Sequence, residues 1–133
     1  MSKMTLDFTR CPIEVTMDQL GGKWTMPIIR DLHMGKTRFK EFLATNPDLS
    51  AKVLSTRLKE LQRHGVVEKK IVSATPLLIE YRLTEKGKAL GDVLISLAAY
   101  SIYFHEDQVY RRPPADKEKD LADLKETFSP SSL

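Results

Sequence analysis

The sequence predicts a mainly α-helical, α+β protein in which a single two-stranded β-hairpin interrupts a series of helices. Three observations support this fold class. The hydrophobic residues have helical spacing as far as residue 64, they alternate with polar residues between 66 and 84, and an uncharged, mostly apolar helix follows. The chain has 133 residues, about one domain, and its 41% of hydrophobic residues is enough to form a core.

Composition excludes several classes of protein. No apolar run reaches the roughly 20 residues of a membrane-spanning helix, and Met1 to Arg10 has no secretory pattern, so we expect a cytoplasmic protein without a membrane partner. One cysteine and three scattered histidines supply neither a disulfide framework nor a metal site. Because no cofactor motif or acid–base pair is present, we expect no catalytic residues, no cofactor and no enzyme activity.

Two helices are expected at the start of the chain. Pro12 suits the first position of a helix that runs to Leu20, with Cys11 as its N-cap, and the glycine pair after Leu20 ends it. Trp24 opens the second helix and is expected to anchor the core. The residues on the inner side of this second helix are Ile28, Ile29 and Leu32.

A short helix and a longer helix follow, joined by a turn-rich link over residues 45–49. The short helix, over 38–44, has apolar residues at helical spacing. The longer helix runs from 50 to 64, because Ser50 suits its N-cap and Gly65 suits the position just beyond its end. Two helices with a short connection are typical of a helix-turn-helix.

The two sides of the 50–64 helix differ sharply. Its apolar stripe consists of Leu54, Leu58 and Leu61, and its opposite side carries Lys52, Thr56, Lys59 and Arg63. Residues 36–70 also carry a net charge of +5, more than the +3 of the whole chain. Long donors on one helix face can read a DNA major groove. The alternative is an ordinary solvated face.

The alternation after Gly65 predicts a β-hairpin, with strands over 66–73 and 78–84 and a tip that contains Pro76. A hairpin directly after the second helix of such a pair is a wing. Lys69 and Lys70 on the first strand, with Arg82 on the second, are placed to reach the flanking phosphates or the minor groove. The alternative for the two lysines is protection of an edge strand.

A long helix is expected from about Glu85 to Asp107, with Thr84 as its cap. It carries no charge from Val93 to Phe104, so it must be buried on every side, and a small winged domain covers only one side. We therefore expect a homodimer. The expected dimerisation residues are Val93, Leu94, Leu97, Ala98, Ser101 and Phe104. A membrane-surface helix is the alternative, but the acidic Glu106 and Asp107 follow it.

Over about residues 8–108 the chain resembles the HxlR-type winged helix-turn-helix transcriptional regulators, which are relatives of the MarR group. The motifs that carry the resemblance are Cys11-Pro12-Ile13-Glu14, Leu20-Gly21-Gly22-Lys23-Trp24, Arg38-Phe39-Lys40-Glu41-Phe42, Ser50, Leu54-Ser55, Leu58-Lys59-Glu60-Leu61, Gly65-Val66-Val67 and Glu80-Tyr81-Arg82-Leu83-Thr84-Glu85-Lys86-Gly87. The resemblance implies a homodimeric regulator that binds double-stranded DNA at an inverted repeat.

The residue pattern and the resemblance together give a set of expected DNA contacts. These are Arg38, Ser50, Lys52, Ser55, Thr56, Lys59, Arg63, Lys69 and Lys70. The resemblance also implies a role for Cys11 as a sensor of oxidants or electrophiles, and a thiol at a helix N-terminus beside Arg10 favours that chemistry. Since the chain has no second cysteine, switching would use a bond between subunits, a mixed disulfide or an adduct. The alternative is a small buried hydrophobe at the dimer interface.

Two other functions are alternatives to DNA binding. A winged helix can dock proteins without binding DNA, and the fold alone does not exclude this. A small thiol enzyme centred on Cys11 has little support, because no histidine is near it in sequence. We divide the chain into an extension (1–10), the winged domain (11–108) and a charged, partly disordered tail (109–133). Within the tail, Leu121, Leu124 and Phe128 have the spacing of one or two helical turns packed against the body.

Overall fold

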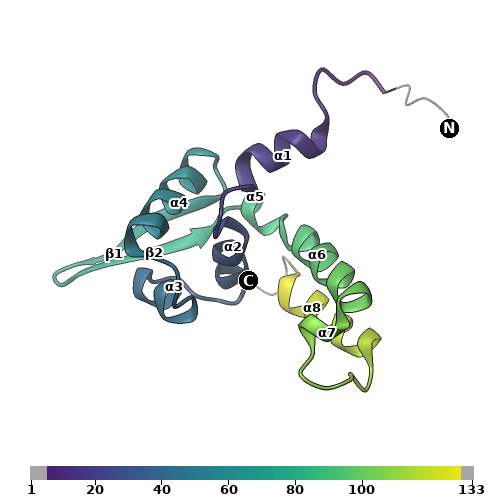
Figure 1. Cartoon of the computed structure of the whole chain (residues 1–133). Coiled ribbons are helices and arrows are strands. Elements are labelled where there is room, and N and C mark those ends of the chain that lie inside the picture. Colours follow the sequence, from purple (N-terminus) through teal and green to yellow (C-terminus); the bar gives the residue numbers. More distant parts are fainter. Residues whose placement is uncertain (1–5, 130–133) are drawn as a thin grey trace.

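The computed structural model describes residues 6–129, in which helices and one β-hairpin follow one another as in Figure 1. The helices before the hairpin are α1 (Pro12–Leu20), α2 (Thr25–His33), α3 (Phe39–Thr45) and α4 (Ala51–Arg63). The strands are β1 (Val67–Ala74) and β2 (Leu77–Leu83). The helices after the hairpin are α5 (Glu85–Lys88), α6 (Gly91–Phe104), α7 (Glu106–Val109) and α8 (Lys117–Phe128). The mainly helical fold with one hairpin is therefore confirmed.

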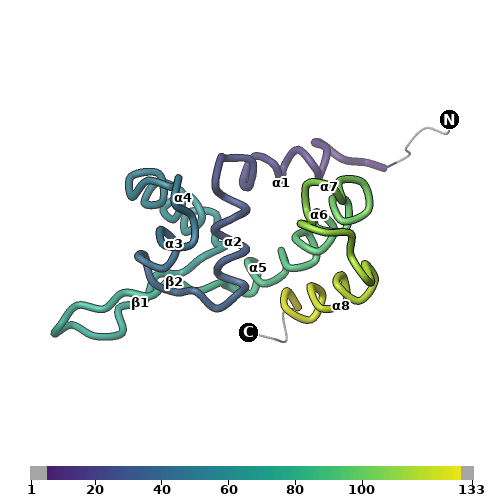
Figure 2. The backbone as a smooth tube through the Cα atoms, turned by 60° about the horizontal axis from the view of Figure 1, so that its bottom comes forward, coloured from purple at the N-terminus to yellow at the C-terminus, as the bar shows by residue number. Residues whose placement is uncertain are grey.

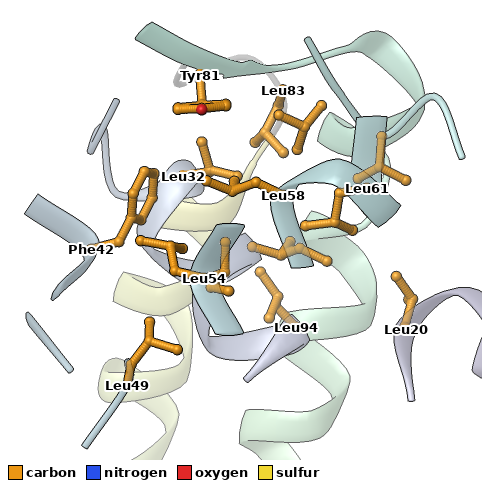
Figure 3. Packing of buried hydrophobic residues seen from close by; sticks show 14 of the residues in the cluster. Leu20, Leu32, Phe42, Leu49, Leu54, Leu58, Leu61, Tyr81, Leu83 and Leu94 are labelled. Atoms are coloured by element: carbon orange, nitrogen blue, oxygen red, sulfur yellow. The ribbon is translucent and has the colours of Figure 1, made fainter. Parts of the chain in front are cut away.

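The core lies where α2, α3, α4 and the base of the hairpin meet (Figure 3). Leu54, Leu58 and Leu61 of α4 are buried there, as their helical spacing predicts. They pack with Ile28 and Ile29 of α2, which are fully buried. The side of α4 that faces away from this cluster is consequently left to solvent.

The hairpin is a two-stranded antiparallel ladder that begins directly after α4. The register pairs Val67 with Leu83 and Lys69 with Tyr81, and it shifts between Ile71 and Ser73, where β1 carries a bulge. The Tyr81 N–H also donates to the Thr37 carbonyl at 2.8 Å, which ties β2 to the segment before α3. Figures 1 and 2 both show the hairpin projecting well beyond the helices as a wing.

The prediction of one continuous helix from Glu85 to Asp107 is wrong, because the structure divides this segment into α5, α6 and α7. Thr84 does cap the first piece, accepting a hydrogen bond from the Gly87 N–H at 3.1 Å. The chain then turns at residues 89–90, and a second break falls at His105, whose backbone is not helical (φ −134°, ψ 43°). The uncharged stretch itself remains one helix, α6.

The tail differs from the expected charged extension. Residues 117–128 form a 12-residue helix, α8, that lies alongside α6 in Figures 1 and 2. Phe128 is buried in the core, and its ring meets that of His33 edge-on with centroids 6.0 Å apart. The spacing of Leu121, Leu124 and Phe128 thus marked a real helix, although one longer than one or two turns. Residues 1–5 of the expected extension and 130–133 of the tail lie outside the described residues.

The approach of α8 to α6 depends on a glycine. A Cβ built at Gly91 would lie 2.0 Å from the Phe128 carbonyl oxygen, a backbone atom. Gly87 is crowded in the same way, since its Cβ would lie 2.2 Å from the Val66 carbonyl oxygen. Both glycines are therefore needed for close packing of backbone against backbone.

Candidate DNA-binding interface

The outward side of α4 carries the side chains that the sequence assigned to DNA contact. The exposed residues of this helix are Ala51, Lys52, Thr56, Lys59 and Arg63. Within residues 6–129, no acidic side chain forms an ion pair with Lys52, Lys59 or Arg63. Three cations on one exposed helix face therefore have no internal counter-charge, and they are available to phosphates or to base edges.

The N-terminus of α4 is fixed by its cap. The Val53 N–H donates to the Ser50 hydroxyl at 3.1 Å, as the sequence predicts for an N-cap serine. The Thr56 hydroxyl donates to the Lys52 carbonyl at 3.0 Å and keeps its oxygen as an acceptor. Ser55 is half-buried. Of these hydroxyl groups, those of Ser50 and Thr56 belong to exposed residues.

A buried polar network that sequence reasoning missed sets the turn between α3 and α4. Asp31 of α2 is completely buried, and it accepts a hydrogen bond from the Asn46 side-chain amide at 2.8 Å. Arg30 completes the group, donating to Asp31 at 3.0 Å and to the Asn46 side-chain oxygen at 3.0 Å. Since Asn46 is the C-cap of α3, this network fixes where α3 ends and the link to α4 begins.

The start of α3 is organised by Glu41. Its carboxylate accepts hydrogen bonds from the backbone N–H groups of Arg38, at 2.9 Å, and Thr37, at 3.3 Å. These bonds hold the pKa of Glu41 below its ordinary value. The half-buried Arg38 forms no ion pair within residues 6–129, although its positive charge also contributes to the lowered pKa of Glu41.

The basic residues of the wing have different surroundings. Lys69 is exposed and has no acidic partner in the described part of the chain. Lys70 lies 3.5 Å from Glu68, and Arg82 lies 2.7 Å from Glu80. The two cations and Glu68 are about half-exposed, whereas Glu80 is only 19% exposed. Ion pairs of exposed cations contribute little to stability, so these cations can exchange their partners for another anion.

The residues expected at a dimer interface separate into two groups. Val93, Leu97 and Phe104 are exposed on α6, and Ala98 and Ser101 are half-buried. Leu94 instead belongs to the core of its own chain and is only 8% exposed, which leaves little of it for a partner contact. The exposed Tyr100, which the sequence did not single out, lies on the same face as Leu97 and Phe104, at helical spacing.

Helix α1 has a second apolar surface. Leu20 is its one buried residue, whereas Ile13 and Met17, one helical turn apart, are exposed. Figures 1 and 2 show α1 extending outward from the helix bundle. Cys11 is the N-cap of this helix, with an exposed side chain. The neighbouring Arg10 pairs with Asp18 at 2.7 Å.

Two kinds of feature are absent from residues 6–129. These residues contain no cluster of three or more histidine, cysteine or acidic side chains of the kind that holds a metal ion. Among them there is also no helix with the length and apolar character needed to cross a bilayer.

Comparison with known proteins agrees with this geometry. The model of the HxlR-like helix-turn-helix family matches residues 19–109. The chain is similar to YdeP of Bacillus subtilis (strain 168), an uncharacterized HTH-type transcriptional regulator, with 34% identity over 114 residues that span 86% of this chain and 88% of YdeP. It is also similar to the HTH-type transcriptional regulator YodB of that strain, with 41% identity over 99 residues that span 74% and 88%.

Two solved structures have the same fold. The reduced form of YodB aligns with a TM-score of 0.64 and 40% identity, over 72% of this chain and 95% of that one. The redox regulator HypR in its reduced form aligns with a TM-score of 0.68 and 30% identity, over 74% and 97%. The winged helix-turn-helix fold is thereby confirmed, and α8 lies beyond the residues that the family model matches. The chain belongs to the HxlR-like helix-turn-helix family.

Proposed function

We propose that the chain is a homodimeric, sequence-specific DNA-binding regulator of transcription that acts in the cytoplasm. Helix α4 lies in the major groove, and the wing contacts the flanking backbone. The observation that carries this proposal is the exposed face of α4, where Lys52, Lys59 and Arg63 have no acidic partner in the described chain. Membership of a helix-turn-helix family supports it.

The dimer is proposed from two apolar surfaces that the described chain leaves uncovered. One is the α6 face with Leu97, Tyr100 and Phe104, and the other is the α1 face with Ile13 and Met17. A two-fold dimer that buries these faces presents two α4 helices, and it reads an inverted repeat with half-sites about 34–36 Å apart. No catalytic residue is needed for this function.

The test begins with selection of bound sequences from a random duplex pool by the purified full-length protein. Binding to a recovered duplex is then measured against salt concentration. We expect Lys59→Ala and Arg63→Ala each to weaken binding by roughly tenfold and to reduce the steepness of the salt dependence. Lys125→Ala, which removes an exposed lysine on α8, is the matched control and is expected to bind like the wild type.

The possible results separate the candidate functions. Unchanged binding of a recovered duplex by both α4 variants would exclude α4 as the reading helix. Recovery of no preferred sequence is instead the result expected of a protein-docking winged helix, because such a protein requires no DNA.

We further propose that Cys11 modulates DNA binding. The thiol is exposed at the N-terminus of α1, a helix that carries part of the proposed dimer surface. The similar proteins of known structure include a redox regulator, HypR, and a quinone-bound form of YodB. Treatment with diamide or a quinone is expected to change operator affinity of the wild type and to leave Cys11→Ser unaffected. Equal responses of the two proteins would contradict a sensing role.

A further inference from the structure

The tip of the wing is apolar, in contrast to the basic residues at its base. From Ile71 to Ile79 the chain carries no charged residue. Ile71 is 66% exposed and Leu77 is 62% exposed, and Val72 and Pro76 between them are also exposed. Large apolar side chains gathered at such exposure on a protein surface usually mark a contact site.

The described chain places nothing over this tip. Figures 1 and 2 show the hairpin leaving the body beside α3 and α4 and ending far from α1, α6 and α8. The apolar surfaces proposed for the dimer lie on α1 and α6. The wing tip is therefore a separate surface, on the same side of the molecule as the reading helix.

Addition of another β-strand to this hairpin is disfavoured by its edge. The bulge between Ile71 and Ser73 interrupts the ladder of β1 close to the tip. Pro76 lies in the turn and has no N–H to donate. Bulges and prolines are the devices by which proteins prevent pairing between exposed strands, so a second copy of the chain is a poor occupant for this edge.

A DNA minor groove fits the tip better. Two lysines directly precede the apolar residues: Lys69, which is exposed and has no acidic partner among residues 6–129, and the half-exposed Lys70. These cations would meet phosphates on either side of a groove. Leucine, isoleucine and proline are residue types that enter the minor groove as wedges between base steps. Resting on the function proposed above, we propose that Ile71, Pro76 and Leu77 insert into the minor groove next to the α4 site and bend the duplex.

Insertion makes the contact selective without hydrogen bonds to bases. Unstacking a base step costs free energy, and the cost is least at flexible pyrimidine–purine steps such as TA and CA. Operators should therefore carry such a step at a fixed distance outside each half-site. The wing would then contribute to specificity at positions where α4 makes no contact.

The experiment uses a duplex recovered by selection with the full-length protein. The duplex carries a fluorophore at each end to report bending by energy transfer, and a second version carries 2-aminopurine at the flanking step to report unstacking. The test protein is the double variant Ile71→Ser, Leu77→Ser. The matched control is Met34→Ser, which alters an exposed methionine at the end of α2 and leaves the apolar tip of the wing unchanged.

We expect the wild type and Met34→Ser to bend the duplex and to raise 2-aminopurine fluorescence. The double variant is expected to retain binding within roughly tenfold, while the bend and the fluorescence change are lost. A duplex that stays straight with the wild type, or equal bending by the double variant, overturns the wedge even though DNA binding stands. Loss of the dimer in the double variant, measured by light scattering, would assign the tip to a second copy and also overturn it. Absence of binding by the wild type would instead refute the proposed function, and the separately measured affinity distinguishes this from failure of the wedge alone.

Discussion

Arg57 of α4 donates a hydrogen bond from Nε to the backbone carbonyl of Lys23, in the turn between α1 and α2, at 2.8 Å. Its Nη1 lies 3.2 Å from the carboxylate of Glu60 on the same helix, which orients the guanidinium group. The Arg57 side chain packs closely against this turn, since a Cβ built at Gly22 would lie 3.0 Å from the Arg57 Nε. This contact joins the reading helix to the segment that follows α1.

Removal of the Arg57 contact is expected to misplace α4. We expect Arg57→Ala to weaken operator binding by roughly tenfold and to lower the free energy of unfolding by about 1–3 kcal/mol, since a charge-assisted hydrogen bond is lost. Arg57→Lys keeps the charge without the fork geometry and should restore little affinity. Fluorescence anisotropy with labelled operator and urea unfolding measure the two effects. Wild-type affinity in Arg57→Ala would show that the contact does not position α4.

The buried network around Asp31 is expected to be important for stability. Asp31→Ala leaves Arg30 and the Asn46 amide without their carboxylate partner, so we expect a loss of roughly 2–4 kcal/mol in unfolding free energy. Asp48→Ala, which changes an exposed aspartate in the link before α4, is the control and should change it by less than about 0.5 kcal/mol. Urea denaturation of the three proteins gives the comparison. Similar midpoints for all three would mean that the network contributes no net stability.

The hydrogen bond from the Tyr110 hydroxyl to Asp120, at 2.8 Å, joins the segment after α7 to α8. Desolvation, together with this bond and the nearby negative charges, raises the pKa of Tyr110 to about 12 from an ordinary value of 10.0. Because the folded state favours the protonated hydroxyl, its contribution to stability is complete below pH 10 and is lost as the pH rises toward 12. Absorbance titration of wild type minus Tyr110→Phe should show this tyrosine ionising near pH 12. Asp120→Asn should lower that midpoint, and an unchanged midpoint would contradict the assigned partner.

The exposed face of α6 allows the dimer to be tested within one helix. Leu97→Glu places a charge in the middle of the proposed interface, and it is expected to shift the protein to monomer at micromolar concentration without unfolding it. Ser96→Glu introduces the same charge at the neighbouring exposed position on another face and is the control. Sedimentation velocity measures the state, and circular dichroism checks the fold. Retention of the dimer by Leu97→Glu would place the interface elsewhere.

Local signals in the sequence predicted the reading helix well. Ser50, Gly65 and the leucine stripe predicted its two ends and its buried side, because caps and helical spacing act within a few residues along the chain. The exposed cations followed from the same spacing. Such local patterns carry no information on contacts between distant segments. The predictions of those contacts were therefore incomplete. Asp31 and Asn46 are 15 residues apart, so no local pattern pairs them.

The packing of the predicted long helix also depends on a distant segment. Gly91 directly precedes Asp92 and the uncharged stretch, and its backbone crowding comes from Phe128, 37 positions later. Leu94 is expected at a partner contact because the helix is apolar all round, whereas the structure places it in the core of its own chain. On a helix that is apolar on all sides, tertiary packing decides which side chains are exposed. The periodicity of the sequence does not predict them.

Helix α8 is expected to be required for the stability of the winged domain, although it lies outside the family match. Phe128→Ala removes a buried ring from the core and should cost about 3–5 kcal/mol in unfolding free energy. Gly91→Ala tests the same packing from the α6 side, because its Cβ would meet the Phe128 carbonyl, and it should destabilise the protein although alanine favours a helix over glycine. Thermal unfolding monitored by circular dichroism measures both, with Ala122→Ser on the exposed side of α8 as the control. If α8 were a dispensable appendage, Gly91→Ala would instead raise the melting temperature, since it would gain helix propensity without a clash.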